Sequence, residues 1–101
     1  MRYLGELHGA GHLKAGGQTI GRADYEIEGY MVRVGEVTGS GEIRMAAESL
    51  KEVFGRTDIL LETHDGRLLG IRFSEKRLQP SSDTAHVDVT GDLPPASEWH
   101  H

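Results

Sequence analysis

Gly5-Glu6-Leu7-His8-Gly9-Ala10-Gly11-His12-Leu13-Lys14 returns thirty positions later as Gly35-Glu36-Val37-Thr38-Gly39-Ser40-Gly41-Glu42-Ile43-Arg44. Four of the ten positions are identical and four carry conservative replacements. In both copies glycine or aliphatic residues stand at odd positions and mostly polar residues at even ones, the period of a strand with one buried face. The paired glycines leave the inner face without side chains, as a strongly bent sheet or closely approaching backbones require. The repeat therefore predicts two strands of one structural design.

Chance similarity between glycine-rich segments and a shared ligand-binding motif are the alternative interpretations of this repeat. Three of the four identities are glycine, in a chain that holds 14 glycines. Neither copy precedes a helix in the G-x-G-x-x-G pattern, so a dinucleotide-binding turn is not indicated.

The alternation continues beyond the first copy of the repeat. It predicts a strand from about Tyr3 to Lys14, a turn at 15–18 and a second strand from about Thr19 to Glu28. A turn is expected at Gly29, after which the apolar residues move to even positions and then return to odd ones. A β-bulge near Gly35 would restore the register. The apolar residues expected inside are Tyr3, Leu7, Leu13, Ala23, Tyr25 and Ile27.

Residues 46–54 break the alternation and predict one short helix. Their apolar residues fall on one stripe at helical spacing. Gly55 suits a left-handed C-cap, and 49–52 offers a capping box if the helix starts late. We expect this helix to cover one end of a barrel or one face of a sheet, and binding of a partner through the stripe is the alternative. The stripe consists of Ala46, Ala47, Leu50, Val53 and Phe54.

Asp65-Gly66 between the apolar runs 59–64 and 67–73 predicts a β-hairpin with a two-residue type I′ turn. In that register Leu60 lies opposite Ile71 and Leu61 opposite Gly70. Both faces then carry leucine or isoleucine, which predicts burial on both sides.

The rest of the chain predicts a polar loop at 74–83 and a last strand at 84–91, with Ala85, Val87 and Val89 buried. The sequence thus indicates an all-β domain over 1–91 and a flexible tail over 92–101. The domain is a small, partly closed barrel or sandwich of about six antiparallel strands, with one short helix between the third and fourth strands. Only 37% of the residues are hydrophobic, so the core must be thin.

Three strands, a helix and two further strands follow one another as in the OB-fold, which this order resembles. The resemblance concerns the fold alone. Oligonucleotide-binding barrels of that kind present aromatic and basic residues on the binding face. Here 6% of the residues are aromatic and the outward strand positions are acidic.

The charge balance narrows the range of partners. Lysine and arginine number 11 against 16 aspartate and glutamate, a net charge of −5 that opposes phosphate backbones and makes nucleic acid an unfavourable partner. No cysteine is present, which excludes disulfides and thiolate metal sites. No apolar run resembles a signal peptide or reaches the roughly 18 residues of a membrane helix. We expect a cytoplasmic protein without a membrane anchor.

Metal binding and catalysis both lack a suitable motif. His8 and His12 share a strand face but lie about 13 Å apart along an extended chain, too far to chelate one ion. His86 and Asp88 form a weaker pair that a cross-strand ligand could complete. No G-x-S-x-G elbow occurs, because Gly39-Ser40-Gly41 lies within a predicted strand. We therefore predict no catalytic residue, no metal and no cofactor.

These observations favour a non-catalytic protein-interaction or assembly module. Exposed strand edges favour self-association, with the first or last strand as the natural edge. The alternative is a barrel that binds a small anion or a nucleotide, for which the candidate ligand-binding residues are Arg22, Arg33 and Arg44. An enzyme with a distributed site is a third, weaker hypothesis.

Overall fold

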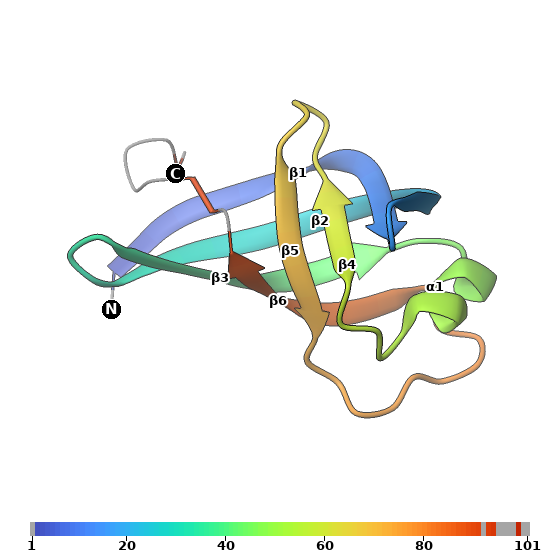
Figure 1. Ribbon diagram of the computed structural model, residues 1–101. Helices are drawn as coiled ribbons and strands as arrows, with labels where there is room; N and C mark the ends of the chain where they lie inside the picture. Colours follow the sequence, from blue (N-terminus) through green and yellow to red (C-terminus); the bar gives the residue numbers. More distant parts are fainter. Residues whose placement is uncertain (1, 92, 95–98, 100–101) are drawn as a thin grey trace.

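A computed structural model describes residues 2–91, 93, 94 and 99. The described residues form six strands and one short helix, and the helix lies between the third and fourth strands as the sequence predicts (Figure 1). In chain order the elements are β1 Arg2–Ala15, β2 Gln18–Arg33, β3 Glu36–Arg44, α1 Ala47–Val53, β4 Ile59–Glu62, β5 Leu68–Phe73 and β6 Thr84–Gly91.

The strands close into a barrel in the order β1-β2-β3-β6-β5-β4. Every neighbouring pair is antiparallel, and the pairing of His12–Ala15 with Ile59–Glu62 joins β4 back to β1. The prediction of an all-β fold is confirmed. Of the two predicted architectures, barrel and sandwich, the structure is a barrel. The barrel differs from the five-stranded OB-fold, because it has a sixth strand, β6, which lies between β3 and β5.

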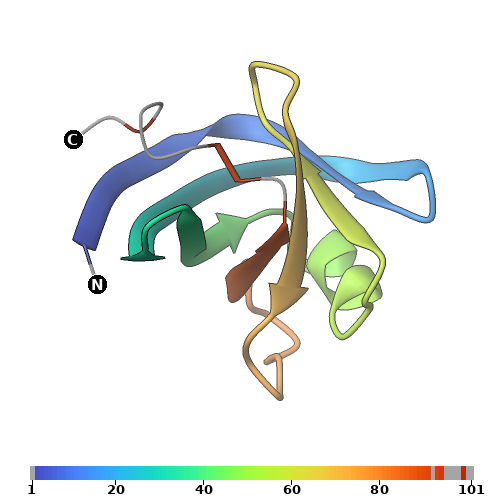
Figure 2. The ribbon, with the colours of Figure 1, turned by 60° about the vertical axis from the view of Figure 1, so that its left-hand side comes forward.

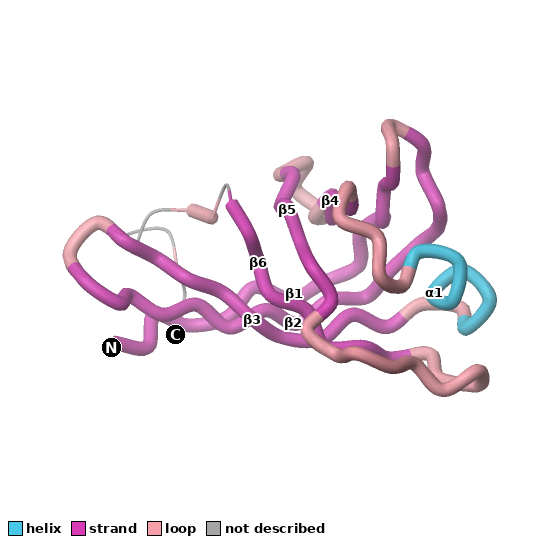
Figure 3. The backbone as a smooth tube through the Cα atoms, turned by 60° about the horizontal axis from the view of Figure 1, so that its bottom comes forward, coloured by secondary structure: helices cyan, strands magenta, loops and turns pink. Residues whose placement is uncertain are grey.

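The barrel core consists of the inward side chains of all six strands together with the helix. Leu13, Ile27 and Ile43 are fully buried, as are Leu50 and Val53 of α1. Figure 3 shows α1 at the end of the long strands opposite the β2–β3 hairpin. The helix thus covers one end of the barrel, as expected. The remaining core residues are Ala15, Ala23, Tyr25, Met45, Ile59, Leu61, Leu69, Ile71, Phe73, Ala85 and Val87.

The ends of α1 follow the prediction only in part. Gly55 has a φ of +87°, the left-handed conformation expected after the helix. The helix does not start late, so the capping box that 49–52 offered for a late start does not arise, and no side chain caps the N-terminus at Ala46. Phe54 is half-buried, and its ring centroid lies 5.1 Å from that of Phe73.

β2 runs straight through Gly29, where the sequence predicted a turn. That prediction is wrong, and the chain turns at 34–35 instead. The β-bulge expected near Gly35 lies just before this turn, between Met31 and Arg33. A side chain at Gly29 would lie 2.5 Å from the ring of Trp99, so this glycine serves close packing and not a turn.

The long hairpins extend beyond the closed barrel as an arm, which we define as residues 2–8 and 29–38 (Figures 1 and 2). β6 pairs with β3 only from Gly39 onward, and β4 does not reach this part of β1. A bulge between Tyr3 and Gly5 turns Leu4 inward, leaving Tyr3 43% exposed where burial was expected. At the tip Val34 is 95% exposed.

The repeat places its two strands, β1 and β3, on either side of β2, and the last glycine of each copy marks a close backbone approach. A Cβ atom at Gly11 would collide with the carbonyl oxygen of Glu62, and one at Gly41 with that of Glu26. Neither carbonyl belongs to a flexible side chain that could move aside. The shared pattern therefore reflects one structural requirement met twice.

The β4–β5 hairpin differs from its prediction by one residue. Leu61 lies opposite Leu69, and the loop has three residues, with Gly66 at φ +86° and its N–H donating to the carbonyl of Thr63 at 2.9 Å. A three-residue loop ending in a left-handed glycine is the next most common hairpin connection after the two-residue turn. Because a one-residue slip reverses every side chain, Leu60 and Leu68 are 38% and 42% exposed and only one face is buried.

Part of the expected tail, residues 92, 95–98, 100 and 101, lies outside the described residues. Leu93 and Trp99, which are described, lie against the long strands, where the sequence predicted that the tail leaves the domain. Trp99 is 6% exposed over Gly29, and Leu93 packs over Gly39. The indole N–H of Trp99 donates to the carbonyl of Pro94 at 3.0 Å. Gly5, Gly29 and Gly39 stand in one cross-strand row beneath this segment.

Candidate functional site

The outward side chains of β1, β2, β3 and β6 form a strongly acidic surface. Cross-strand pairing aligns them in two neighbouring rows, whereas sequence alternation had indicated outward acidic positions only strand by strand. We call this surface the acidic face. Its first row is Glu6, Glu28, Ser40 and Asp88, and its second row is His8, Glu26, Glu42 and His86.

Two like-charge pairs stand directly opposite each other on this face: Glu6 with Glu28, and Glu26 with Glu42. Such pairs destabilise a sheet, where opposite charges would stabilise it. Neither row contains lysine or arginine; Arg72 lies opposite Asp88 on the next strand, β5. The fold thus holds concentrated negative charge at some cost in stability.

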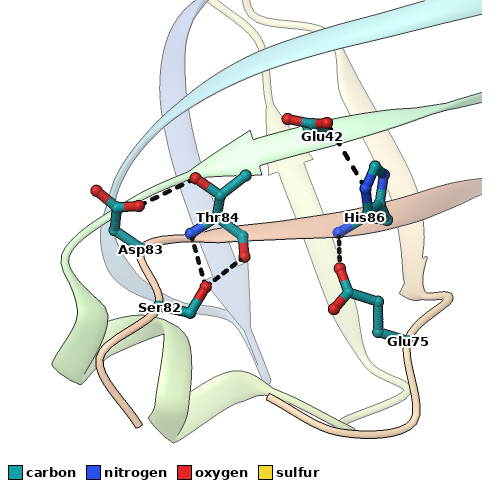
Figure 4. Close-up of polar contacts among 6 residues, drawn as sticks. All are labelled: Glu42, Glu75, Ser82, Asp83, Thr84 and His86. Atoms are coloured by element: carbon teal, nitrogen blue, oxygen red, sulfur yellow. Dashed lines mark hydrogen bonds and ion pairs between the residues drawn. The ribbon is translucent and has the colours of Figure 1, made fainter. Parts of the chain in front are cut away.

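Histidines flank the carboxylates at both sides of the face. The Nδ1 atom of His8 lies 3.3 Å from Oε1 of Glu6, and Nε2 of His86 lies 3.6 Å from Oε1 of Glu42. Figure 4 shows the second contact, together with Glu75, which reaches in from the 74–83 loop and accepts the backbone N–H of His86 at 2.8 Å. His86, at the β6 side of the face, is therefore contacted both by strand β3 and by the 74–83 loop.

A groove of about 490 Å³ runs along the β2–β3–β6 part of this face. Four carboxylates line it: those of Glu26, Glu28, Glu42 and Asp88. His86 and the small residues Ser40, Gly41 and Ser74 complete the lining together with Val87. A shallow groove with this lining suits cationic groups.

The negative potential of the face acts on a neighbouring pair of tyrosines. Tyr3 and Tyr30 lie opposite each other on the arm, with ring centroids 5.4 Å apart. The charge of Glu28, followed by burial, raises the pKa of Tyr30 above its ordinary value of 10.0. For Tyr3 burial raises the pKa first, followed by the charges of Glu28 and Glu6. Two aromatic rings thus adjoin the carboxylates.

The histidines suspected of metal binding stay apart. His8 lies opposite Glu26 and His12 opposite Arg22, so the two rings have different neighbours. Glu42 is the cross-strand partner of His86 that sequence spacing had left open. Within residues 2–91, 93, 94 and 99, histidine, aspartate and glutamate form no group of three that could hold a metal ion.

The three candidate arginines do not converge. Arg22 and Arg44 line one groove of about 540 Å³ beside α1, but Asp24 and Asp83 line it too. The guanidinium of Arg22 lies 3.5 Å from the carboxylate of Asp24. Arg33 is at the end of β2, 2.9 Å from Glu36. This groove presents mixed charge, which weakens the case for an anion.

A second polar cluster, which sequence analysis missed, fixes the β4–β5 hairpin to β2. The hydroxyl of Tyr25 accepts the backbone N–H of His64 at 3.3 Å and lies 3.1 Å from Nδ1 of the same residue. That oxygen accepts one hydrogen bond, and its own hydrogen can be donated to Nδ1. Gly9 leaves room for this contact, because a Cβ there would lie 3.1 Å from both partner atoms. The cluster is structural: it holds the hairpin over Gly9 of the repeat.

Comparison with known proteins gives no further assignment. No family model, no curated protein and no solved structure matches this chain. None of the helical residues in the described part of the chain forms a span suited to crossing a membrane.

Proposed function

We propose that this barrel is a non-catalytic interaction module whose acidic face binds a basic polypeptide segment. The observation that carries the proposal is the alignment of five carboxylates in two neighbouring cross-strand rows, two pairs of them like charge against like charge. Proteins tolerate locally unfavourable arrangements, such as like charges directly opposite each other, at functional sites. A partner that brings lysine or arginine would relieve the repulsion.

The shape and surroundings of the face favour a polypeptide over a small cation. The groove crosses three strands, and the Tyr3–Tyr30 pair extends the surface along the arm. Aromatic rings are enriched where proteins contact each other. They also stabilise arginine and lysine through cation–π contacts. The absence of cysteine from the sequence agrees with a reducing compartment, and we propose a cytoplasmic location.

Fluorescence anisotropy with a labelled lysine- and arginine-rich peptide tests this function. We expect binding that weakens as salt is added, because exposed charges are screened within about 10 Å at 0.1 M salt. The double variant Glu26→Gln/Glu42→Gln should weaken binding about tenfold, since it removes both charges of one like-charge pair.

The matched control is Glu48→Gln/Glu52→Gln, which makes the same change in net charge on α1. If the control lowers affinity as much as the double variant on the face, the peptide responds only to net charge and the proposed site is wrong. An acidic peptide of equal length should show no binding.

Binding of a small anion or nucleotide beside α1 is the second candidate, because Arg22 and Arg44 line one groove there. Titration with inorganic phosphate and with a nucleoside triphosphate, followed by calorimetry, tests it. Binding that Arg44→Ala abolishes and that the glutamine variants leave unchanged would replace our proposal with this one.

A further inference from the structure

The first strand leaves most of one edge without a partner strand. β1 pairs with β2 along Arg2–Ala15, whereas β4 pairs with the opposite edge only at His12–Ala15. Among the described residues, no strand pairs with that edge from 5 to 11. Such an edge offers free N–H and C=O groups to another strand.

The sequence along this edge is self-complementary when two copies run antiparallel. In Gly5-Glu6-Leu7-His8-Gly9 the order around Leu7 is glycine, acid, leucine, base, glycine. We propose that two copies of this chain pair antiparallel through β1, with Leu7 at the two-fold axis. Each Glu6 then lies opposite the His8 of the second copy, and each Gly5 opposite a Gly9.

The neighbouring registers are less favourable, because they place like side chains opposite each other or need an edge that β4 already occupies. Residues directly opposite in an antiparallel pair point to the same face, so only registers that match outward with outward residues are allowed. Centring on Glu6 places that carboxylate opposite its own copy, and centring on His8 places imidazole opposite imidazole. Centring on Gly9 would pair Glu6 with His12, whose edge β4 already occupies. Only the register about Leu7 places a Glu6 carboxylate opposite a His8 imidazole twice.

The local geometry supports this pairing. Glu6 and His8 already contact each other within one chain, at 3.3 Å. The His8 side chain is 71% exposed, so it can exchange this partner for a carboxylate of the second copy. Gly5 and Gly9 bring no side chains to the new seam. The two acidic faces would lie on the same side of one continuous sheet.

Sedimentation velocity over a range of concentrations tests the proposal on the native sequence and on three variants. We expect a reversible dimer. His8→Glu should weaken it about tenfold, because it turns two attractive cross-strand pairs into repulsive ones. The swap Glu6→His/His8→Glu restores the two carboxylate–imidazole pairs of this register and should restore the dimer.

His86→Glu is the matched control: it introduces the same charge beside Glu42, on a strand whose two edges are paired. It should leave dimerisation unchanged. A native chain that stays monomeric overturns the proposal, as does an equal effect of His8→Glu and His86→Glu. A double variant that remains monomeric, with a native circular dichroism spectrum, overturns the register. The proposal does not rest on peptide binding, which His86→Glu and the glutamine variants probe separately.

Discussion

The barrel end beside α1 and the arm beneath Trp99 are closed by different means. At α1, bulky side chains such as Leu13, Ile43 and Leu50 fill the interior and are fully buried. On the arm, a row of glycine backbone is covered by one aromatic ring and Leu93. A chain with 37% hydrophobic residues can fill one core with side chains, and it closes the second region by bringing backbone and ring together. The barrel should therefore dominate stability, while the arm depends on a few contacts, chiefly that of Trp99.

The largest expected effect lies at the helix end of the barrel. Leu50→Ala removes a fully buried side chain and should lower the free energy of unfolding by about 2–5 kcal/mol. That is a large part of the roughly 5–15 kcal/mol available to a domain. Val34→Ala on the arm tip, where the side chain is 95% exposed, should change it by less than about 0.5 kcal/mol. Urea denaturation followed by circular dichroism measures both. Equal midpoints would contradict the core position of α1.

A smaller effect is expected where the ring meets the glycine row. The added Cβ of Gly29→Ala would lie 2.5 Å from the Trp99 ring, so the ring must move or the arm must distort, at about 1–3 kcal/mol. Trp99 is the only tryptophan, so its fluorescence reports this movement directly. We expect emission to shift to longer wavelength as the ring meets water.

Gly91→Ala is the control for this change, because a Cβ there would have no heavy atom within 4 Å. Its emission should match that of the native protein. An unshifted spectrum for Gly29→Ala would mean that the ring does not lie on this glycine.

The smallest effect concerns the charge beside the arm. Glu28→Gln removes the main cause of the raised pKa of Tyr30, which should fall toward its ordinary value. A raised pKa means that the folded state holds the proton more tightly than the unfolded chain. This stabilisation is therefore present below the ordinary pKa of tyrosine and is lost as pH rises through the folded-state value. Spectrophotometric titration of the phenols measures the shift, and Glu48→Gln should leave it unchanged.

The spacing of apolar residues in the sequence was sufficient to predict most strands of the barrel and its helix. Alternation placed β6 at its observed bounds, and the helical stripe of 46–54 differs from α1 by one residue at each end. These segments follow local rules, because one face is buried and the other is solvated. The hairpin at Asp65-Gly66 obeys a local rule as well, but two turn types suit the same residues. Choosing the shorter turn moved the register by one and put Leu68 on the wrong face.

What sequence analysis missed depends on residues far apart in the chain. Gly29 looks like a turn until Trp99 is known to lie on it. Likewise the acidic face is visible in the sequence only as separate alternations, since the pairing of Glu26 with Glu42 depends on the register between β2 and β3. Arg33 lies apart from Arg22 and Arg44 for a different reason: β2 continues through Gly29, so Arg22 and Arg33 are eleven residues apart on one long strand.

Closure of the barrel has a consequence for how the chain folds. The β1–β4 seam joins distant segments: Lys14 contacts Glu62 across 48 residues of sequence. Such contacts cost chain entropy before they return energy, and proteins dominated by them fold in milliseconds to seconds instead of microseconds. Until the seam forms, the free edges of β1 and β4 are open to other chains. Refolding yield should therefore fall as protein concentration rises, because intermolecular pairing competes with closure.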